Sequence, residues 1–217
     1  MLFRSAEYVV FHVSDVQTTE STHFKFKRSN EEIIRASADL LNEMFAEEDG
    51  SIALLMENLW CPGLTLVDPC ETRLLLDSID YPNKGIMFDT GHLIHTDFSL
   101  ASQQEGLAYV NRRLDEHERA GLLRYFRGMH LQQSITGDYY RYLIENPIHW
   151  APTYYDRMGQ VFECAFKIDK HEPFICEGVR DMINRLPLEY LTFEFITTSV
   201  EQHAGYLEAQ RRAIGIP

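Results

Sequence analysis

The sequence is poor in cysteine, with four in 217 residues and none spaced as Cys-x-x-Cys. Four thiols are too few for a disulfide scaffold, so we expect buried free thiols in a reducing compartment. The N-terminus also lacks the basic-then-apolar layout of a secretory signal, which makes the cytoplasm the default location. The four thiols belong to Cys61, Cys70, Cys164 and Cys176.

Long apolar runs and basic residues are scarce as well. No run approaches the ~20 residues of a membrane span, which excludes an integral membrane protein and predicts no membrane partner. Lys and Arg number 20 against 33 Asp and Glu, for a net charge of -13. An acidic surface repels phosphate backbones and so argues against a nucleic-acid partner. The remaining composition, 45% apolar and 24% charged, is that of an ordinary globular protein.

The first five residues, Met1-Leu-Phe-Arg-Ser5, precede a strong β-run with no role of their own. One reverse translation of them, with GTG as the start codon, matches the end of a common sequencing-library adapter. We therefore expect 1–5 to be an adapter scar and the chain to be a fragment, with a genuine short N-terminus as the alternative. Such segments are left out of fold reasoning.

Short strand-like runs alternate with helical patterns along the rest of the chain. A capping box at Ser29 and Glu32 opens the first long helix, and Asp49-Gly50 ends it. A polar loop with a stray edge strand at Phe24 and Phe26 is expected at 14–28, and a long aromatic loop after 131. Apolar strands separated by helices are typical of parallel βα units, so 6–217 is predicted to be one α/β domain. The strands are expected at 8–13, 52–56, 85–88, 125–131 and 190–196, and further helices at 69–79, 101–120, 153–166, 177–185 and 199–214.

Each predicted strand ends near a residue that can bind metal. Taken alone, a histidine in a strand is usually a core residue, and a glutamate in a strand is usually a solvated residue at the rim of the sheet. In a parallel barrel, however, the carboxyl ends of all strands meet at one face, where function resides. Carboxylates and imidazoles that converge there form a divalent-metal site. The residues are His12, Glu57, Asp89, His130 and Glu194.

The segment Ile168-Asp-Lys-His171 adds two further ligand types on one extended edge, Asp169 and His171. With His92, three residues after Asp89, they predict a second metal pocket. The alternatives are that Asp169 and His171 bind substrate or form a surface pair. The other histidines considered are interpreted as surface or packing residues, namely His95, His117, His149 and His203.

These motifs, in this order, resemble the xylose-isomerase-like TIM-barrel superfamily, which includes sugar isomerases and epimerases and the endonuclease IV type of DNA-repair enzyme. The resemblance covers nearly the whole chain after residue 6. Phe88-Asp-Thr-Gly-His92 is the most specific of its segments. The others are Met56-Glu-Asn58 with Pro62-Gly63, Gly128-Met-His-Leu131, Ile168-Asp-Lys-His171 and Phe193-Glu-Phe195.

The resemblance implies a partial (β/α)8 TIM barrel, because the chain matches only the last five βα units of the family's eight. The single metal of the family's sugar epimerases would be held here by Glu57, Asp89, His130 and Glu194. The ion would be Mn, Mg, Co or Zn. The three-metal cluster of endonuclease IV-like members would add His12, His92, Asp169 and His171.

The leading functional prediction is a metal-dependent sugar or sugar-phosphate isomerase/epimerase. Glu57 and Glu194 would move a proton next to the substrate carbonyl, while His92, Asp169 and His171 would bind substrate. Aromatic residues could wall the sugar or simply pack: Trp60, Tyr139, Tyr140 and Trp150. The alternatives are an endonuclease IV-like phosphodiesterase and an inactive fragment or binding protein that keeps the fold. Assembly into a homo-oligomer is left open.

Overall fold

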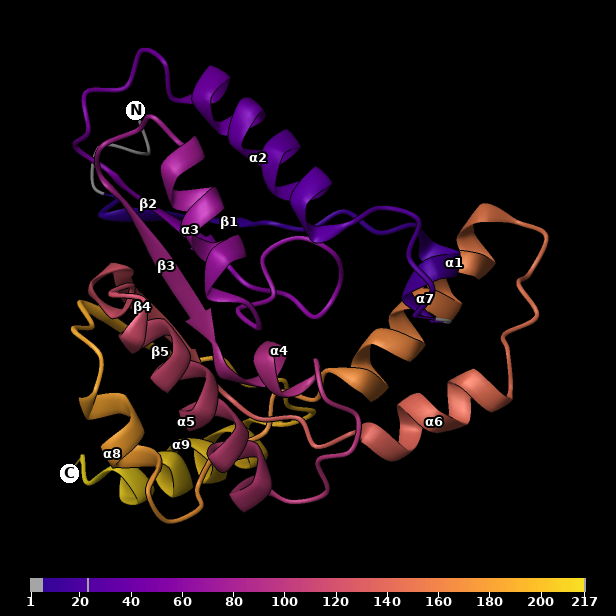
Figure 1. Cartoon of the computed structure of the whole chain (residues 1–217). Helices are drawn as coiled ribbons and strands as arrows, with labels where there is room; N and C mark the ends of the chain where they lie inside the picture. The colour runs from indigo at the N-terminus through magenta and orange to yellow at the C-terminus, as the bar shows by residue number, and fades with distance from the viewer. Residues whose placement is uncertain (1–5, 23, 217) are drawn as a thin grey trace.

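The computed structural model describes residues 6–22 and 24–216; the proposed adapter scar at 1–5 lies outside them. Its centre is a five-stranded sheet in which every neighbouring pair is parallel, in the order β1-β2-β3-β4-β5 (Figure 1). The prediction of an α/β domain with five parallel strands is therefore confirmed. The strands are β1 (Tyr8–His12), β2 (Ala53–Glu57), β3 (Lys84–Asp89), β4 (Phe126–Leu131) and β5 (Tyr190–Phe193).

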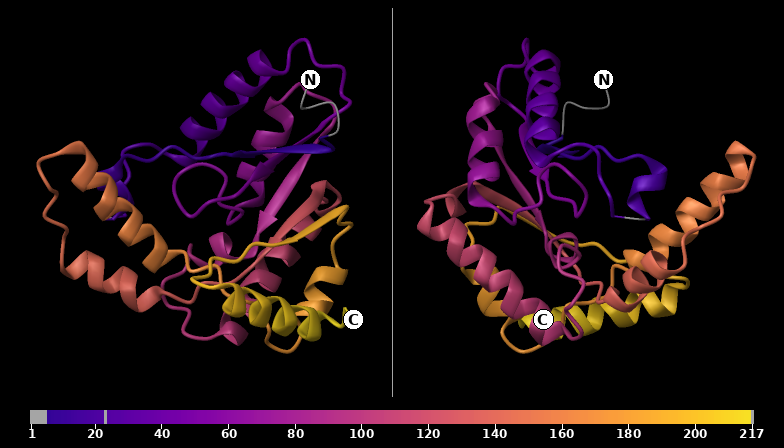
Figure 2. Two further views of the ribbon diagram at one scale, coloured as in Figure 1. Left: turned by 180° about the vertical axis from the view of Figure 1, so that it is seen from behind. Right: turned by 45° about the vertical axis from the view of Figure 1, so that its right-hand side comes forward.

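The sheet curls into a half-barrel (Figure 2). Although β1 and β5 are its two edge strands, the rings of Tyr8 and Tyr190 have centroids 4.4 Å apart. A small apolar cluster, which includes Leu55 and Met87, lies with these rings. Gly128 on β4 leaves space for it, because a Cβ there would lie 2.6 Å from the Met87 Cε atom.

Helices cover the convex face of the sheet (Figure 1). The first begins at the predicted capping box, where the Ser29 hydroxyl accepts a hydrogen bond from the Glu32 amide. Apolar side chains of these helices and of the sheet form the main core. Packing on both sides of β2, β3 and β4 explains their continuous apolar sequence, whereas the edge strands β1 and β5 are only partly buried. The helices are α2 (Asn30–Met44), α3 (Pro69–Ser78), α5 (Gln103–Arg119), α8 (Val179–Asn184) and α9 (Val200–Ile214), and a 3-10 turn, Leu123–Tyr125, precedes β4.

Three helices form an arm that extends from the carboxyl-terminal edge of the sheet (Figures 1 and 2). They are α1 (Thr18–Ser21), α6 (Gly137–Glu145) and α7 (Tyr154–Ile168). The predicted stray strand at Phe24 and Phe26 is wrong, since these residues lie in irregular chain after α1. The predicted loop after 131 contains α6, which buries Tyr140 and Leu143 against α7. This small core forms only against α7, which begins nine residues after the end of α6, so the local sequence pattern of α6 does not reveal it.

A short helix, α4 (Thr90–Ile94), follows β3 directly and was not predicted. All four cysteines are free: Cys61 and Cys164 are buried, whereas Cys70 is exposed and Cys176 is half-buried. The expectation of buried thiols is therefore wrong for the last two. Among the described residues, no helix combines the length and apolar character needed to cross a membrane.

Candidate metal centre

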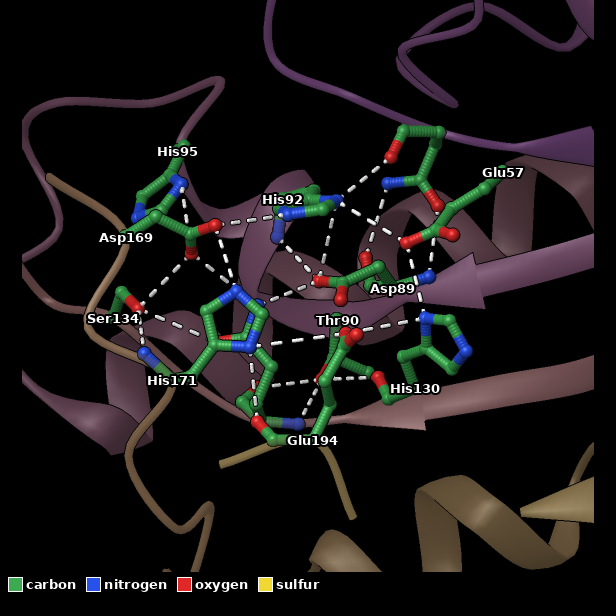
Figure 3. Close-up of polar contacts among 12 residues, drawn as sticks. Glu57, Asp89, Thr90, His92, His95, His130, Ser134, Asp169, His171 and Glu194 are labelled. Atoms are coloured by element: carbon green, nitrogen blue, oxygen red, sulfur yellow. Dashed lines mark hydrogen bonds and ion pairs between the residues drawn. The ribbon is translucent and has the colours of Figure 1, made fainter. Parts of the chain in front are cut away.

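The carboxyl-terminal edge of the sheet brings the predicted strand-end residues together (Figure 3). Two pairs are direct neighbours in the sheet register, His12 with Glu57 and Asp89 with His130. Glu194 follows the last residue of β5, because that strand is shorter than the sequence predicts. Parallel strands all end at this edge, which is why residues far apart in the sequence meet there.

Four of these residues form the first cluster: Glu57, Asp89, His130 and Glu194. Each offers one ligand atom, and the four atoms lie within 4.8 Å of one another. The Nδ1 atom of His130 is 3.0 Å from Glu57 Oε1 and 3.2 Å from Glu194 Oε2. Glu57 and Asp89 are almost fully buried, while the Glu194 side chain is 41% exposed. The cluster therefore has a buried side and one side open to a ligand.

Three carboxylates and one imidazole in a buried place need a counter-charge. Burial raises the pKa of Asp89 to about 7, although the charge of His92 opposes this. Burial also pushes the Glu57 pKa upward, but hydrogen bonds from His12 and His130 outweigh it and bring it to about 2. Burial lowers the His130 pKa, yet its bonds to Glu194 and Glu57 raise it to about 10. Protonated imidazole thus supplies the positive charge that a divalent cation would otherwise bring.

The Asp89 carboxylate is held so that one oxygen stays available. Its Oδ1 atom accepts hydrogen bonds from the His92 amide at 2.7 Å and from Gln132 Nε2 at 2.8 Å. Its Oδ2 atom is buried and has no hydrogen-bond partner. An unpartnered buried carboxylate oxygen inside a cluster of ligand atoms fits a cation. The donor set, three carboxylates and an imidazole, suits Mn, Mg, Co or Zn and does not choose among them.

Two amide side chains that sequence reasoning missed support Asp89. Asn58 pairs with its backbone, donating from Nδ2 to the Asp89 carbonyl at 3.0 Å and accepting from its amide at 2.9 Å. Gln132 binds its carboxylate, and Gly91 makes this approach possible, since a Cβ there would lie 2.1 Å from Gln132 Oε1. Such partners fix the orientation of a ligand.

The second cluster consists of His92, Asp169 and His171, whose ligand atoms also lie within 4.8 Å of one another. Asp89 caps the start of α4 and places His92 on its first turn. His171 has a positive φ of 49°, which is unusual for a residue with a side chain. The Ser134 hydroxyl stabilises this turn by accepting from the amides of Lys170 and His171 at 2.8 and 3.0 Å.

Both histidines of the second cluster are oriented by backbone carbonyls. His92 Nδ1 donates to the Asn58 carbonyl at 2.9 Å, and His171 Nδ1 donates to the Glu194 carbonyl at 3.0 Å. Their Nε2 atoms point to the same oxygen, Asp169 Oδ2, at 3.1 and 2.7 Å. Without a metal, protonated imidazoles donate from Nε2 to this oxygen. A cation bound here would take the place of those protons, with neutral imidazoles offering their Nε2 lone pairs.

The contacts between the two imidazoles and the nearby carboxylates also set the pKa values in the second cluster. Burial lowers the His92 pKa, but the charge of Asp89 and the hydrogen bond to Asp169 raise it to about 10. Burial lowers the pKa of His171, but its hydrogen bond to Asp169 and the surrounding carboxylate charges together raise it. Burial raises the Asp169 pKa, but the hydrogen bonds of the two imidazoles outweigh that effect and hold it well below its usual range.

The remaining histidines take different places. His12, 59% exposed, lies outside both clusters with its Nε2 atom 3.2 Å from Glu57 Oε2. His117 is a packing residue, bonded to Thr72 and to the Arg113 carbonyl. His95 is buried, and its Nδ1 atom lies 3.9 Å from Asp169 Oδ1, so it borders the second cluster. Burial lowers its pKa to about 4. His149 and His203 are exposed.

Of the four aromatic residues considered as walls, Trp60 is closest to the clusters. Its ring lies 5.1 Å from the His92 ring and 4.8 Å from the His95 ring, centroid to centroid. Tyr140 also faces His95, at 5.8 Å. Tyr139 instead contacts Cys164 and Tyr142 in the arm. Tyr140 thus connects the arm to His95, which borders the second cluster, whereas the adjacent Tyr139 does not.

Comparison with known proteins adds no identification. No model of a protein family matches the chain, and no curated protein matches it either. The function must therefore be argued from the geometry of the two clusters.

Proposed function

We propose that this chain provides one half of a (β/α)8 barrel and functions as a divalent-metal-dependent sugar or sugar-phosphate isomerase or epimerase. The observation that carries the proposal is the convergence of Glu57, Asp89, His130 and Glu194 at one end of parallel strands. The half-barrel curl supports the barrel assignment, because Tyr8 and Tyr190 meet across the concave face from opposite edges. Five adjacent strands out of eight would form slightly more than half of such a barrel.

The first cluster would hold the ion through Glu57, Asp89, His130 and Glu194. When bound there, a divalent cation supplies polarisation of a substrate carbonyl and binding of an adjacent hydroxyl. Asn58 and Gln132 keep the Asp89 carboxylate in place for this role.

Glu57 and Glu194 would carry the proton. They lie on either side of His130 Nδ1, at 3.0 and 3.2 Å, so their carboxylates face a common space. Glu57 is buried at the base of the cluster, while Glu194 is accessible from outside. One carboxylate removes the proton from the carbon beside the carbonyl, and the other returns it on carbon or oxygen.

The second cluster, together with His12 beside Glu57, favours one other candidate, a phosphodiesterase that uses several metal ions. His92, Asp169 and His171 would then bind a further cation, whereas in the isomerase they bind substrate or a supporting cation. The net charge of -13 opposes a DNA substrate, because DNA enzymes need a positive track. This candidate therefore ranks second.

The experiment measures proton exchange directly. The chain is loaded with Mn, Mg, Co or Zn, its metal content is determined, and it is incubated in D2O with a panel of aldoses, ketoses and their phosphates. Deuterium incorporated at the carbon beside the carbonyl, and lost with chelator, is the expected result. A metal-loaded chain that cleaves abasic DNA and exchanges no sugar proton would replace the isomerase with the phosphodiesterase.

A further inference from the structure

His95 is a buried histidine for which the proposed reaction has no use. It ends α4, three residues after His92, and is 2% exposed. By hydrogen-bond geometry neither of its ring nitrogens has a partner, although the Ser134 backbone is close enough to influence its pKa. A buried polar atom without a well-formed hydrogen bond is costly, so two on one ring require an explanation.

One carboxylate oxygen of Asp169, Oδ1, lies on the side of His95 and is called the outer oxygen below. The inner oxygen, Oδ2, faces His92 and His171 as described above. The outer one, Oδ1, is surrounded by potential donors: Ser134 Oγ at 3.4 Å, Gln132 Nε2 at 3.5 Å and His95 Nδ1 at 3.9 Å (Figure 3). Asp169 is thus placed with one oxygen toward the cluster and the other toward donors.

Two more unpartnered polar groups lie beside His95. The hydroxyl of Tyr140 and the Nε1 atom of Trp60 are buried without hydrogen bonds, and both rings contact the imidazole. A cavity of about 10 Å³ opens here, with His95, Ser134, Thr136 and Tyr140 among its lining residues. Its lining is mostly apolar, so a water there would find few hydrogen-bond partners, and a direct contact between the side chains is favoured.

The hydrogen-bond donors and acceptors of His95, Tyr140 and Asp169 complement one another. A neutral imidazole has one N–H and one lone pair, a tyrosine hydroxyl has one proton to donate, and a carboxylate only accepts. If Nδ1 of His95 carries the proton, it points to Asp169 and leaves Nε2 to accept from the Tyr140 hydroxyl. One arrangement therefore satisfies the three groups together.

We propose that His95 is a positioning residue of the second cluster: its Nδ1–H holds Asp169 Oδ1, and its Nε2 accepts a hydrogen bond from the Tyr140 hydroxyl. The 3.9 Å separation is longer than a hydrogen bond, and a small rotation of the Asp169 carboxylate would bring it into range. Such partners of a ligand raise metal affinity by about 10- to 100-fold. The inference rests on cation binding at the second cluster, the supporting role included in the proposed function.

The test is a Co²⁺ titration of the whole chain, followed by visible absorption, with His171→Asn used to assign the signal of the second cluster. His95→Phe removes both ring nitrogens and should weaken Co²⁺ binding at the second cluster by about 10- to 100-fold. Affinity at the first cluster should be unchanged. His95→Asn places an amide donor near the Nδ1 position and should recover much of the loss, whereas His95→Gln, with its amide near Nε2, should recover less.

Tyr140→Phe removes only the hydroxyl and should weaken the same site by a smaller factor. Tyr139→Phe is the matched control, since that neighbouring hydroxyl contacts Cys164, and it should leave both affinities unchanged. A merely structural His95 would lower the thermal midpoint and leave the affinity ratio of the two clusters as it is.

Three results would overturn the inference. The first is an unchanged second-site affinity in His95→Phe; if that variant does not fold, equal affinities of His95→Asn and His95→Gln decide the same question. The second is a wild-type chain that binds one ion only, at the first cluster, which leaves the proposed function standing. The third is no ion at either cluster, which removes both.

Discussion

Gly91 and Gln132 are in such close contact that a single methyl group would separate them: a Cβ at position 91 would lie 2.1 Å from Gln132 Oε1 and 2.2 Å from its Nε2 atom. Gln132 is fully buried and holds Asp89 Oδ1 through the same amide. Gly91 therefore permits the contact through which Gln132 orients the carboxylate of Asp89, a candidate metal ligand two residues earlier in the chain.

Gly91→Ala should displace the Gln132 amide and release Asp89. We expect divalent-metal affinity at the first cluster to fall by about 10-fold or more, since a supporting partner of a ligand is lost. Leaving the buried amide unpaired should also cost about 1–3 kcal/mol of unfolding free energy. Metal titration and chemical denaturation measure the two effects. Gly205→Ala is the control: it lies on α9 with no atom within 4 Å of the added Cβ and should be neutral or stabilising.

Glu57→Gln keeps the shape of the side chain but removes a negative ligand and a proton carrier. Proton transfer by a positioned side chain contributes about 10²–10⁴-fold, so sugar isomerisation or epimerisation should fall at least that far. The measurement is turnover at saturating metal, with the exposed Glu177→Gln as control. Wild-type turnover in Glu57→Gln would refute the assignment of Glu57.

His171→Asn separates the two candidate functions. In an isomerase that works at the first cluster, it should reduce sugar turnover much less than Glu57→Gln does. In a phosphodiesterase that needs several metals, it should remove one ion and be nearly as severe. Metal content and turnover of both variants, on sugars and on abasic DNA, give the answer. His149→Asn, at an exposed histidine, controls for loss of an imidazole elsewhere.

The metal-free chain should lose stability at alkaline pH. Burial opposes the charge on His130, but hydrogen bonds to Glu194 and Glu57 raise its pKa from 6.5 to about 10. A raised pKa stabilises the fold fully below the unfolded value, and the contribution is lost as pH rises from 6.5 through 10. Thermal unfolding in chelator should therefore show a falling midpoint over this range. His130→Gln should flatten that part of the profile, and an identical slope in both proteins would contradict the expectation.

The ligand atoms at strand ends could be predicted because parallel strands end at one edge, so the position of Glu57 or His130 in its strand already places it. The roles of the Asn58 and Gln132 amides could not, because they act on Asp89 across 31 and 43 positions, even though Asn58 stands in one of the recognised segments. His95 packs against aromatic rings, as its packing interpretation predicts, but its approach to Asp169 could not be foreseen because Asp169 lies far along the chain. The helix α6 was missed because its buried face exists only against α7.

Glu194 contacts both clusters. Its carboxylate lies 3.2 Å from His130 Nδ1 in the first cluster, and its backbone carbonyl lies 3.0 Å from His171 Nδ1 in the second. A cation that fixes its side chain in the first cluster also restrains the peptide that orients His171 in the second. With a cation in each cluster, the two sites would be thermodynamically linked, and linkage is reciprocal: whatever factor the first ion imposes on the affinity of the second, the second imposes on the first. Glu194 would share this coupling with Asp89, which lies in the first cluster and caps the helix that carries His92.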